Sequence, residues 1–462
     1  MDIGVSGWKR SASNAPAVVE QLKLIRKEIR KDFPIRDIVV LGMGGSVSAA
    51  RVLASHFENE LREKQVRLRI ADTTEPSSVE AILRDFNSKN GIVIVSSRSG
   101  SNIEALCLGQ LFTAQLKAVL GDDLVAAKHF ISISEENTPL SMLAETQNWR
   151  GSITVPRDVS GRFQALTAFG LAPVVFAGIN IEEILQAAEQ MEFICFDGTL
   201  CPAYCIAESI HQNFLDGKDK LIISYDEEAR YFARWLEQLI AESLGKDGKG
   251  VIPLPVPRQR AEKLMQQDCP DLQSISLVDL DSKDIGGDFV RWMYAIEKLA
   301  EMLEIDPFDQ PITEALKQSI RFSLRRSSGT HGFTSLSQQL TDHRVWNAQF
   351  LPSIVGPSNY VVLKSWAPPS PENTRSLENL ASSFQDYFKR PVVIAEGPGY
   401  MHSSSQMYKG GPNSGVFVMV AQESEADFAI PGAQYSLRQL YRAAFCNDLS
   451  EMLAYNRIVV KL

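Results

Sequence analysis

The sequence predicts an α/β protein with two doubly wound, parallel-sheet domains followed by a C-terminal α/β region. Short apolar runs alternate along the chain with segments of helical periodicity, and strands that alternate with helices form parallel sheets. At 462 residues, 44% of them hydrophobic, the chain is also longer than one hydrophobic core supports. These two observations predict several domains of one α/β type.

The first domain is expected to cover residues 1–180. A helix should begin near Asn14 and Pro16, because Val18 and Leu22 then recur on one helical face. Apolar runs predict strands at 37–41, 66–70, 92–95, 130–133 and 153–155.

A long apolar stretch, residues 163–181, closes this domain. It contains Gln164, Pro173 and Asn180, which disfavour a membrane span. We expect a buried helix and a turn in its place.

The second domain is expected to cover residues 181–330, and the turn-forming residues 327–332 mark its end. Helices are predicted at 182–193, 203–214, 287–303 and 311–325, with strands at 221–225, 251–254 and 274–278. Residues 331–462 should form a C-terminal α/β region. Its predicted strands are 360–363, 392–394 and 416–420.

The net charge of the chain limits the kinds of partner that it can bind. A formal net charge of −9 argues against nucleic-acid or anionic-membrane binding, because both surfaces require a basic face. A small anionic substrate remains compatible with this net charge.

The six cysteines show no paired framework, and Cys201 and Cys205 are expected to be buried core thiols. With no signal-peptide pattern at the N-terminus, a reducing, cytoplasmic location fits best.

Two loops that follow predicted strands have the composition of anion-binding loops. Gly42-Met43-Gly44-Gly45-Ser46 permits a tight turn and a close approach of backbone N–H groups to an anion at the next helix. The residues after it do not complete the dinucleotide pattern Gly-x-Gly-x-x-Gly, so no nucleotide cofactor is expected.

The second loop, residues 96–104, places hydroxyls, an amide and one cation at the start of a predicted helix. Hydroxyl and backbone donors, the helix dipole and the Arg98 guanidinium together suit a phosphate monoester. A hydroxyl-rich helix cap without a ligand is the alternative interpretation.

Together these loops resemble those of sugar isomerase (SIS) domains. Val159–Phe163 is similar to the Gly-Gly-Arg-Tyr-Ser segment of phosphoglucose isomerases, and Glu242–Lys246 to their Glu-Ser-x-Gly-Lys signature. Residues 307–317 resemble their Phe-Asp-Gln and Glu-x-x-Lys pair. Four motifs in the family's order are far more specific than one, and the chain resembles the glucose-6-phosphate isomerase (phosphoglucose isomerase) family.

Within that family, residues 235–243, 402–406 and 409–415 look closest to the isomerase half of bifunctional transaldolase/glucose-6-phosphate isomerases. Two departures from the family pattern stand out. Arg98, Ser99 and Asn102 occupy a loop that usually has a lysine followed by threonines, and Phe163-Gln164 replaces Tyr-Ser.

The resemblance implies reversible isomerisation of glucose 6-phosphate and fructose 6-phosphate through a cis-enediolate, in glycolysis and gluconeogenesis, with no metal and no cofactor. Glu242 is implied as the base that carries a proton between C1 and C2. Arg162 is implied to stabilise the enediolate oxygen, because arginine keeps its charge. Taken alone, these residues could instead be a solvated helix-end glutamate and a surface arginine.

Opening the sugar ring requires groups that shuttle a proton, and histidine and lysine suit that task. The resemblance implies Lys317 and His402, with His331 as a rival for the histidine. The substrate-binding residues that it implies are Gly45, Ser46, Ser97, Arg98, Ser99, Asn102, Gly161 and Gln310.

No metal site is assigned, since the histidines do not cluster as they do in a metal-dependent cupin isomerase. Two other functions stay open: a non-catalytic, sugar-phosphate-binding regulatory protein, and an isomerase of a related sugar phosphate. The expected partner is a small-molecule sugar phosphate, with no nucleic acid and no membrane. A homodimer and an association with a separate transaldolase are kept as hypotheses.

Overall fold

The computed structural model describes residues 6–198, 201–277, 284–327 and 333–462. The packing divides the chain into two compact units. Unit 1 comprises Met1–Asp72, Val79–Ile206 and Leu280–Ala295, and unit 2 comprises Thr73–Ser78, Ala207–Asp279 and Ile296–Leu462. The division into three domains at residues 180 and 330 stays a prediction.

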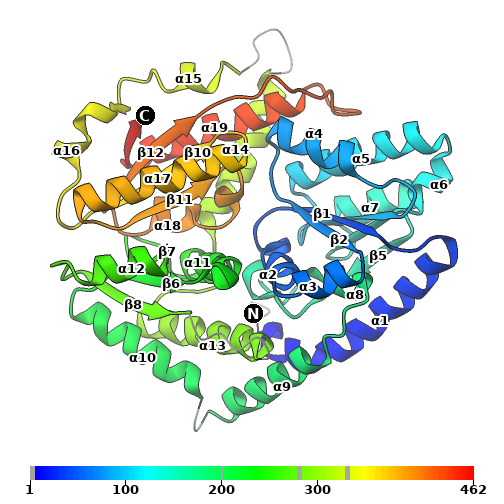
Figure 1. The fold of residues 1–462 in the computed structure, drawn as a ribbon, viewed down its shortest axis with the longest axis horizontal. Coiled ribbons are helices and arrows are strands. Elements are labelled where there is room, and N and C mark those ends of the chain that lie inside the picture. Colours follow the sequence, from blue (N-terminus) through cyan, green and yellow to red (C-terminus); the bar gives the residue numbers. More distant parts are fainter. Residues whose placement is uncertain (1–5, 199–200, 278–283, 328–332) are drawn as a thin grey trace. The chain divides into compact units, whose positions relative to one another are not determined.

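Unit 1 is built on a five-stranded parallel sheet with the strand order β2-β1-β3-β4-β5 (Figure 1). In the pairing register, Val39 of β1 lies between Arg69 of β2 and Val93 of β3. Both β1 and β3 are buried along their whole length, as central strands covered on both faces should be. The strands are β1 (Asp37–Gly42), β2 (Arg67–Ala71), β3 (Gly91–Ser96), β4 (Phe130–Ser134) and β5 (Gly151–Thr154).

Helices cover both faces of this sheet, with α5, α6 and α7 on one side and α1, α3 and α8 on the other (Figure 1). The predicted alternation of strands and helices around a parallel sheet is confirmed. The helices up to α9 are α1 (Ser11–Asp32), α2 (Ser48–His56), α3 (Glu58–Glu63), α4 (Pro76–Asp85), α5 (Ile103–Leu120), α6 (Asp123–Ala127), α7 (Pro139–Thr146), α8 (Ala168–Ala177) and α9 (Glu182–Asp197), with short 3-10 helices η1 (Gly7–Arg10), η2 (Gly44–Ser46) and η3 (Gly161–Phe163).

Helix α1 begins at Ser11, a turn before the predicted start, and Pro16 lies inside it. The reason is a side chain distant in sequence. The buried Glu192 carboxylate accepts hydrogen bonds from the backbone N–H groups of Ala12 (2.9 Å) and Ser13 (3.1 Å). A carboxylate at a helix N-terminus satisfies donors that the helix leaves unpaired, so the extra turn is stable.

The apolar stretch 163–181 forms the ten-residue helix α8, buried throughout, as predicted. Among the described helices, α5 is long and apolar enough to cross a membrane, and α9 and α10 (Pro202–Leu215) reach that length only together, across a 67° bend. Buried side chains such as Leu108 and Phe112 line α5, which packs against β1 and β3 as a core helix of the sheet.

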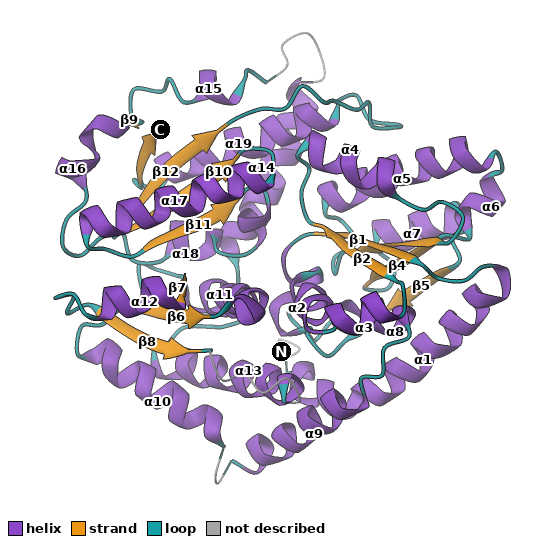
Figure 2. Cartoon of the chain, viewed as in Figure 1, coloured by secondary structure: helices purple, strands orange, loops and turns teal. Residues whose placement is uncertain are grey.

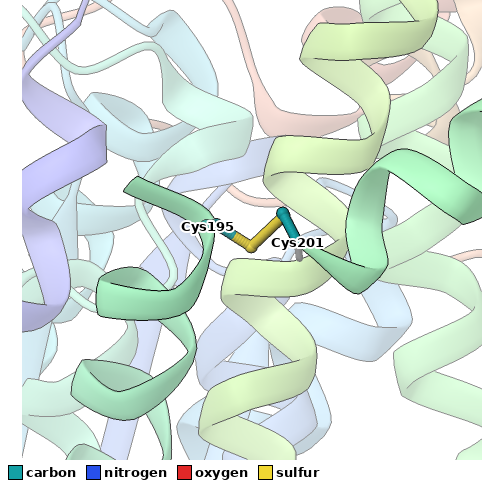
Figure 3. The surroundings of a disulfide bond; sticks show 2 residues. All are labelled: Cys195 and Cys201. Atoms are coloured by element: carbon teal, nitrogen blue, oxygen red, sulfur yellow. A yellow bond between two sulfur atoms is a disulfide. The ribbon is translucent and has the colours of Figure 1, made fainter. Parts of the chain in front are cut away.

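The expectation for the cysteines was wrong. Cys201 precedes α10, and its sulfur is bonded to Cys195 near the end of α9 (Figure 3). The two Cα atoms lie 4.5 Å apart, within the range that a disulfide spans. Cys205 is exposed rather than buried. The disulfide removes part of the sequence argument for a reducing compartment.

Unit 2 contains two further parallel sheets (Figure 2). The three-stranded sheet has the order β7-β6-β8 and the five-stranded sheet the order β11-β10-β12-β13-β9. The strands are β6 (Lys220–Tyr225), β7 (Ile252–Pro257), β8 (Leu272–Ser276), β9 (Trp346–Asn347), β10 (Tyr360–Trp366), β11 (Val392–Glu396), β12 (Gly415–Ala421) and β13 (Ile458–Lys461).

The predicted strands of unit 2 are present, although β8 begins two residues before its predicted start, and β9 and β13 were not predicted. The helices of unit 2 alternate with these strands. Besides α10, which begins in unit 1, they are α11 (Arg230–Leu244), α12 (Arg258–Met265), α13 (Ile285–Met302, which also begins in unit 1), α14 (Pro311–Ser327), α15 (Leu336–Gln339), α16 (Leu351–Ile354), α17 (Pro371–Phe388), α18 (Ser405–Gly410) and α19 (Leu437–Ala454), with 3-10 helices η4 (Glu227–Ala229), η5 (Ala348–Phe350) and η6 (Gly399–His402).

In each of the three sheets, one strand (β1, β6 or β10) lies between the two strands that come next in the sequence, one on each side. In the larger sheet of unit 2, Val361 and Leu363 of β10 face a core that includes Ala381 of α17. Alternate residues of a strand point to opposite faces, so Lys364 of β10 points away from this core and toward α19, where it meets Asp448.

Candidate active site

The two glycine- and serine-rich loops meet at the carboxyl ends of β1 and β3, the adjacent strands between which the strand order of unit 1 reverses. The Ser96 hydroxyl donates to the backbone carbonyl of Ser46 (3.0 Å), and the N–H of Arg98 donates to the Ser46 hydroxyl (3.4 Å). In open α/β sheets, ligands bind at this switch point. The structure therefore brings Gly45 and Ser46 together with the second loop.

The segment that carries Arg162 packs directly on the first loop. A Cβ atom at Gly45 would lie 2.5 Å from the carbonyl carbon and oxygen of Gly161 and 2.9 Å from the backbone nitrogen of Arg162. Only glycine permits this approach. Arg162 is 1% exposed, so the surface-arginine alternative is wrong.

Within the second loop, several polar side chains form hydrogen bonds to the loop itself and to the helix that follows it. The Asn102 carboxamide oxygen accepts from the Ala105 N–H (2.8 Å) and caps α5, while the Ser97 hydroxyl accepts from the Asn102 N–H (3.4 Å). The hydroxyls of Ser99 and Ser101 lie 2.9 Å apart. The helix-cap interpretation thus holds for Asn102, and phosphate binding by this loop stays a prediction.

Arg98 has a counter-charge that the sequence did not reveal. One of its guanidinium nitrogens lies 3.5 Å from the Glu135 carboxylate, which follows β4, and 3.5 Å from the Val159 carbonyl. The Arg98 side chain is 30% exposed. An anion in this loop would therefore compete with Glu135 for the same cation.

In unit 2, Glu242 lies near the end of α11 and is 4% exposed, so it is not a solvated helix-end residue. One turn earlier, Gln238 is also buried. Its side-chain nitrogen donates to the Glu242 carboxylate (3.3 Å) and to the backbone carbonyl of His402 (3.0 Å). The amide therefore links the predicted base to the segment that carries the predicted histidine.

His402 is itself 5% exposed, and residues that follow it form hydrogen bonds to α11. The hydroxyls of Ser404 (2.7 Å) and Tyr408 (3.3 Å) donate to the Glu237 carboxylate, which Arg234 also contacts at 2.9 Å. Burial opposes the charge of Arg234, but Glu237 outweighs it and raises the pKa of Arg234. The Glu237 carboxylate is thus the shared acceptor of three donors.

The end of α11 and helix α18 approach closely at a glycine. A Cβ atom at Gly245 would lie 2.4 Å from the Cα of Met407, and Gln406 donates to the Gly245 carbonyl (2.9 Å). Lys246, the lysine of the Glu-Ser-x-Gly-Lys motif, donates to the carbonyls of Ser243 (3.2 Å) and Asp306. This lysine holds the end of the helix against the loop that leads to α14.

Lys317 is joined to this cluster through its helix. The Gln406 side chain accepts from the N–H of Ile312 in the first turn of α14 (3.2 Å). Gln310 donates to Glu314 (3.3 Å), and the Lys317 ammonium pairs with the same Glu314 oxygen at 2.7 Å. Lys317 is 23% exposed. His331, the rival histidine, lies outside the described residues.

The predicted residues thus form two groups, each within one unit. Gly45, Ser46, Ser97, Arg98 and Gly161 cluster with Arg162 in unit 1, and Glu242 and His402 cluster in unit 2. Within the described residues, no group of three His, Cys, Asp or Glu side chains could hold a metal ion.

Sequence reasoning missed the residues that support this cluster. Glu237 and Gln238 lie in a segment that resembles the family, but no role was assigned to them from the sequence. An acid and an amide next to Trp235 and Leu236 on an apolar helix are a signal that could have indicated buried polar side chains. Glu135 follows an apolar strand and had no such signal.

Parallel doubly wound sheets with glycine- and serine-rich loops at a switch point define an α/β fold of the ligand-binding kind. The phosphoglucose isomerase family matches residues 9–251, just over half of the chain, and the chain belongs to this family.

Curated relatives agree. The glucose-6-phosphate isomerase of Caldanaerobacter subterraneus subsp. tengcongensis is 29% identical over 265 residues, 55% of this chain and 58% of the relative. That of Methanocaldococcus jannaschii is 30% identical over 224 residues, 47% of this chain and 53% of the relative. The alignments thus span a little over half the length of these relatives.

Solved structures show the same fold. A hypothetical protein from Thermus thermophilus superposes with a TM-score of 0.61 at 21% identity, covering 70% of this chain and 91% of that chain. A glucose-6-phosphate isomerase from Chlamydia trachomatis superposes with a TM-score of 0.55 at 16% identity, covering 69% and 74%.

Proposed function

We propose that this chain isomerises glucose 6-phosphate and fructose 6-phosphate through a cis-enediolate. The observation that carries the proposal is the buried Glu242, bonded through Gln238 to the carbonyl of His402, in a member of the phosphoglucose isomerase family. A carboxylate held in one rotamer can take a proton from one sugar carbon and return it to the next. The names of the curated relatives support the same substrate pair.

Each group of residues has a role in this proposal. The loop with Ser97, Arg98 and Ser99 binds the phosphate at the switch point of unit 1, where backbone donors and the start of α5 favour an anion. Arg162 stabilises the negative oxygen of the enediolate. In unit 2, Glu242 is the base that moves the proton between C1 and C2.

His402 and Lys317 open the sugar ring before isomerisation. Ring opening moves a proton from the C1 or C2 hydroxyl to the ring oxygen, and Glu242 alone suffices once the chain is open. His402→Ala should therefore slow turnover of the cyclic hexose phosphates severely but leave reaction of erythrose 4-phosphate, which is too short to close the same ring. His331→Ala is the control, and a selective defect in that variant would transfer the role to His331.

We expect the enzyme to work in glycolysis and gluconeogenesis, in the cytoplasm, without a metal. Homodimer formation and association with a separate transaldolase remain hypotheses, which light scattering of the pure protein, alone and with a transaldolase, tests.

One coupled assay tests the function. Purified protein is supplied with fructose 6-phosphate in EDTA, and glucose 6-phosphate is followed with a dehydrogenase. Turnover is expected and should survive EDTA. Binding of the sugar phosphate without turnover would instead indicate a regulatory protein.

A further inference from the structure

A cluster of charges lies in the core of unit 2, apart from the residues assigned above. Lys364 of β10, Lys409 of α18 and Asp448 of α19 all have side chains with 0% exposure, and Glu451 of α19 lies beside them. The Asp448 carboxylate accepts from Lys364 (2.6 Å) and from the Tyr400 hydroxyl (2.6 Å), and its other oxygen lies 3.0 Å from Lys409.

The surrounding contacts extend this cluster. The Lys409 ammonium also pairs with Glu451 at 2.6 Å, and the Trp366 indole N–H donates to the Tyr400 hydroxyl (2.9 Å). Lys364 lies 4.4 Å from the centroid of the Tyr400 ring. Two ammonium and two carboxylate groups balance in charge, which buried ions require.

Apolar side chains of the same volume could fill this part of the core with equal or greater stability, so stability alone does not account for three fully buried charges and the partly buried Glu451. Ion pairs and charge-assisted hydrogen bonds are directional, however, and fix the position of the groups they join. The cluster therefore fixes the segments of chain that its members belong to.

Asp448 contacts both ends of the segment that contains His402. Tyr400 lies two residues before His402, and Lys409 lies seven residues after it. Between these two anchors, the carbonyl of His402 and the side chains of Ser404 and Tyr408 bond to α11, and the Gln406 side chain bonds to Gly245 directly after it. The segment is thus held on one side by Asp448 and on the other by the helix that carries Glu242.

We propose that Asp448 is a positioning residue for the reaction: through Tyr400 and Lys409 it sets the place of His402 relative to Glu242. The inference rests on the proposed function and names a residue beyond it. Asp448 acts through the histidine segment, so its loss should affect the ring-opening step that His402 serves more than the proton transfer that Glu242 performs.

The test compares two measurements on purified full-length variants. Isomerisation of fructose 6-phosphate requires ring opening, whereas exchange of the C2 proton of erythrose 4-phosphate with D2O requires only the base. In Tyr400→Phe, which removes one hydroxyl and keeps every charge, kcat/KM for fructose 6-phosphate should fall roughly tenfold. Proton exchange should stay within about twofold of the parent. Asp448→Asn should show a larger selective loss.

Tyr441→Phe is the matched control. Tyr441 is a second buried tyrosine against Trp366, with ring centroids 5.1 Å apart, and its hydroxyl has no hydrogen-bond partner among the described residues. This variant should match the parent in both measurements. If Asp448→Asn does not fold, Tyr400→Phe decides.

Equal loss of both activities in Tyr400→Phe, or no loss, would overturn the positioning role. These outcomes are distinct from failure of the proposed function, in which the parent protein itself would not isomerise fructose 6-phosphate.

Discussion

Gln238 and Glu242 lie one turn apart on α11, and the Gln238 amide nitrogen donates to the Glu242 carboxylate at 3.3 Å while it also bonds the His402 carbonyl at 3.0 Å. Gln238→Leu should lower kcat/KM about 10- to 100-fold, because one hydrogen bond to a charged group is worth roughly 1.5–3 kcal/mol. Loss of the Gln238 donor destabilises the charged form of the Glu242 carboxylate. In a plot of kcat against pH, the fall in kcat at low pH should therefore begin at a higher pH.

The matched control is Gln273→Leu, which removes a buried amide that donates to the Lys218 carbonyl at 2.6 Å in the same unit. It should cost stability without moving the pH profile. An unshifted acid limb in Gln238→Leu would mean that the amide does not act on the base.

Replacement of the base should separate chemistry from folding. In Glu242→Gln the new carbonyl oxygen can still accept from Gln238, so the fold should hold, but an amide cannot take a proton. We expect kcat to fall by at least on the order of 10² to 10⁴, with nearly unchanged binding of a competitive sugar phosphate. Glu228→Gln, at an exposed position in η4, serves as the control. Near-parental turnover in Glu242→Gln would exclude this residue from the mechanism.

Arg98 and Glu135 should have opposite effects on substrate affinity. Their side chains lie 3.5 Å apart, so Arg98→Ala removes a cation that binds phosphate while Glu135→Gln removes its competitor. Steady-state kinetics should show a higher KM in the first variant, by about 10-fold or more, and a lower KM in the second. A KM that moves in the same direction in both variants would show that the pair holds the loop together rather than binding the anion.

The contact between Gly45 and Gly161 predicts a strong effect from one methyl group. Gly45→Ala would place Cβ 2.5 Å from the Gly161 carbonyl, so the two loops must separate and Arg162 must move. We expect a fall in kcat/KM on the order of 10²-fold. Gly151→Ala, where nothing lies within 4 Å of the added Cβ, should leave the kinetics intact. Equal behaviour of the two variants would contradict the argument.

The buried lysine predicts a pH-dependent stability. Burial lowers the pKa of Lys364 to about 8, despite the attraction of Asp448, whereas lysine in an unfolded chain titrates near 10.5. Between these values the unfolded chain binds a proton that the native state does not, so the contribution of Lys364 to the free energy of unfolding rises with pH, by on the order of 3 kcal/mol.

Urea denaturation from pH 7.5 to 10.5 checks this sign. The free energy of unfolding of the parent minus that of Lys364→Met should increase across the range. Lys27→Met, on an exposed face of α1, controls for the loss of a lysine in general. A difference that stays flat or falls would show that Lys364 keeps its proton throughout.

The strands at the centres of the sheets were predictable from the sequence, because short continuous apolar runs such as 37–41 and 92–95 are typical of buried strands in parallel sheets. Edge elements were harder. Strand β9 consists of Trp346 and Asn347 alone, both exposed, and a pairing of two residues leaves no hydrophobic pattern. The start of α1 was missed because its cap, Glu192, lies 180 residues away in sequence.

In the candidate site, too, some residues could be predicted from the sequence and others could not. Glu242, Arg162 and His402 were found through motifs, and their burial follows from the structure. Some of the residues that hold them, such as Asp448, come from separate elements, and sequence proximity does not link these residues to the site. Asp448 nonetheless left one signal: it interrupts the apolar stripe of Leu440, Ala444 and Met452 on α19.

The common plan of the three sheets has a consequence for the growing chain. Strands β1, β6 and β10 are each paired on both edges by strands that follow them in the sequence. During synthesis each of these apolar strands therefore keeps at least one edge of backbone N–H and C=O groups without its sheet partner until the second of two later strands has emerged. Unpaired apolar edges recruit other chains. Nascent chains that stall before Gly91, Leu272 or Gly415 should therefore be the ones that aggregate or bind chaperones.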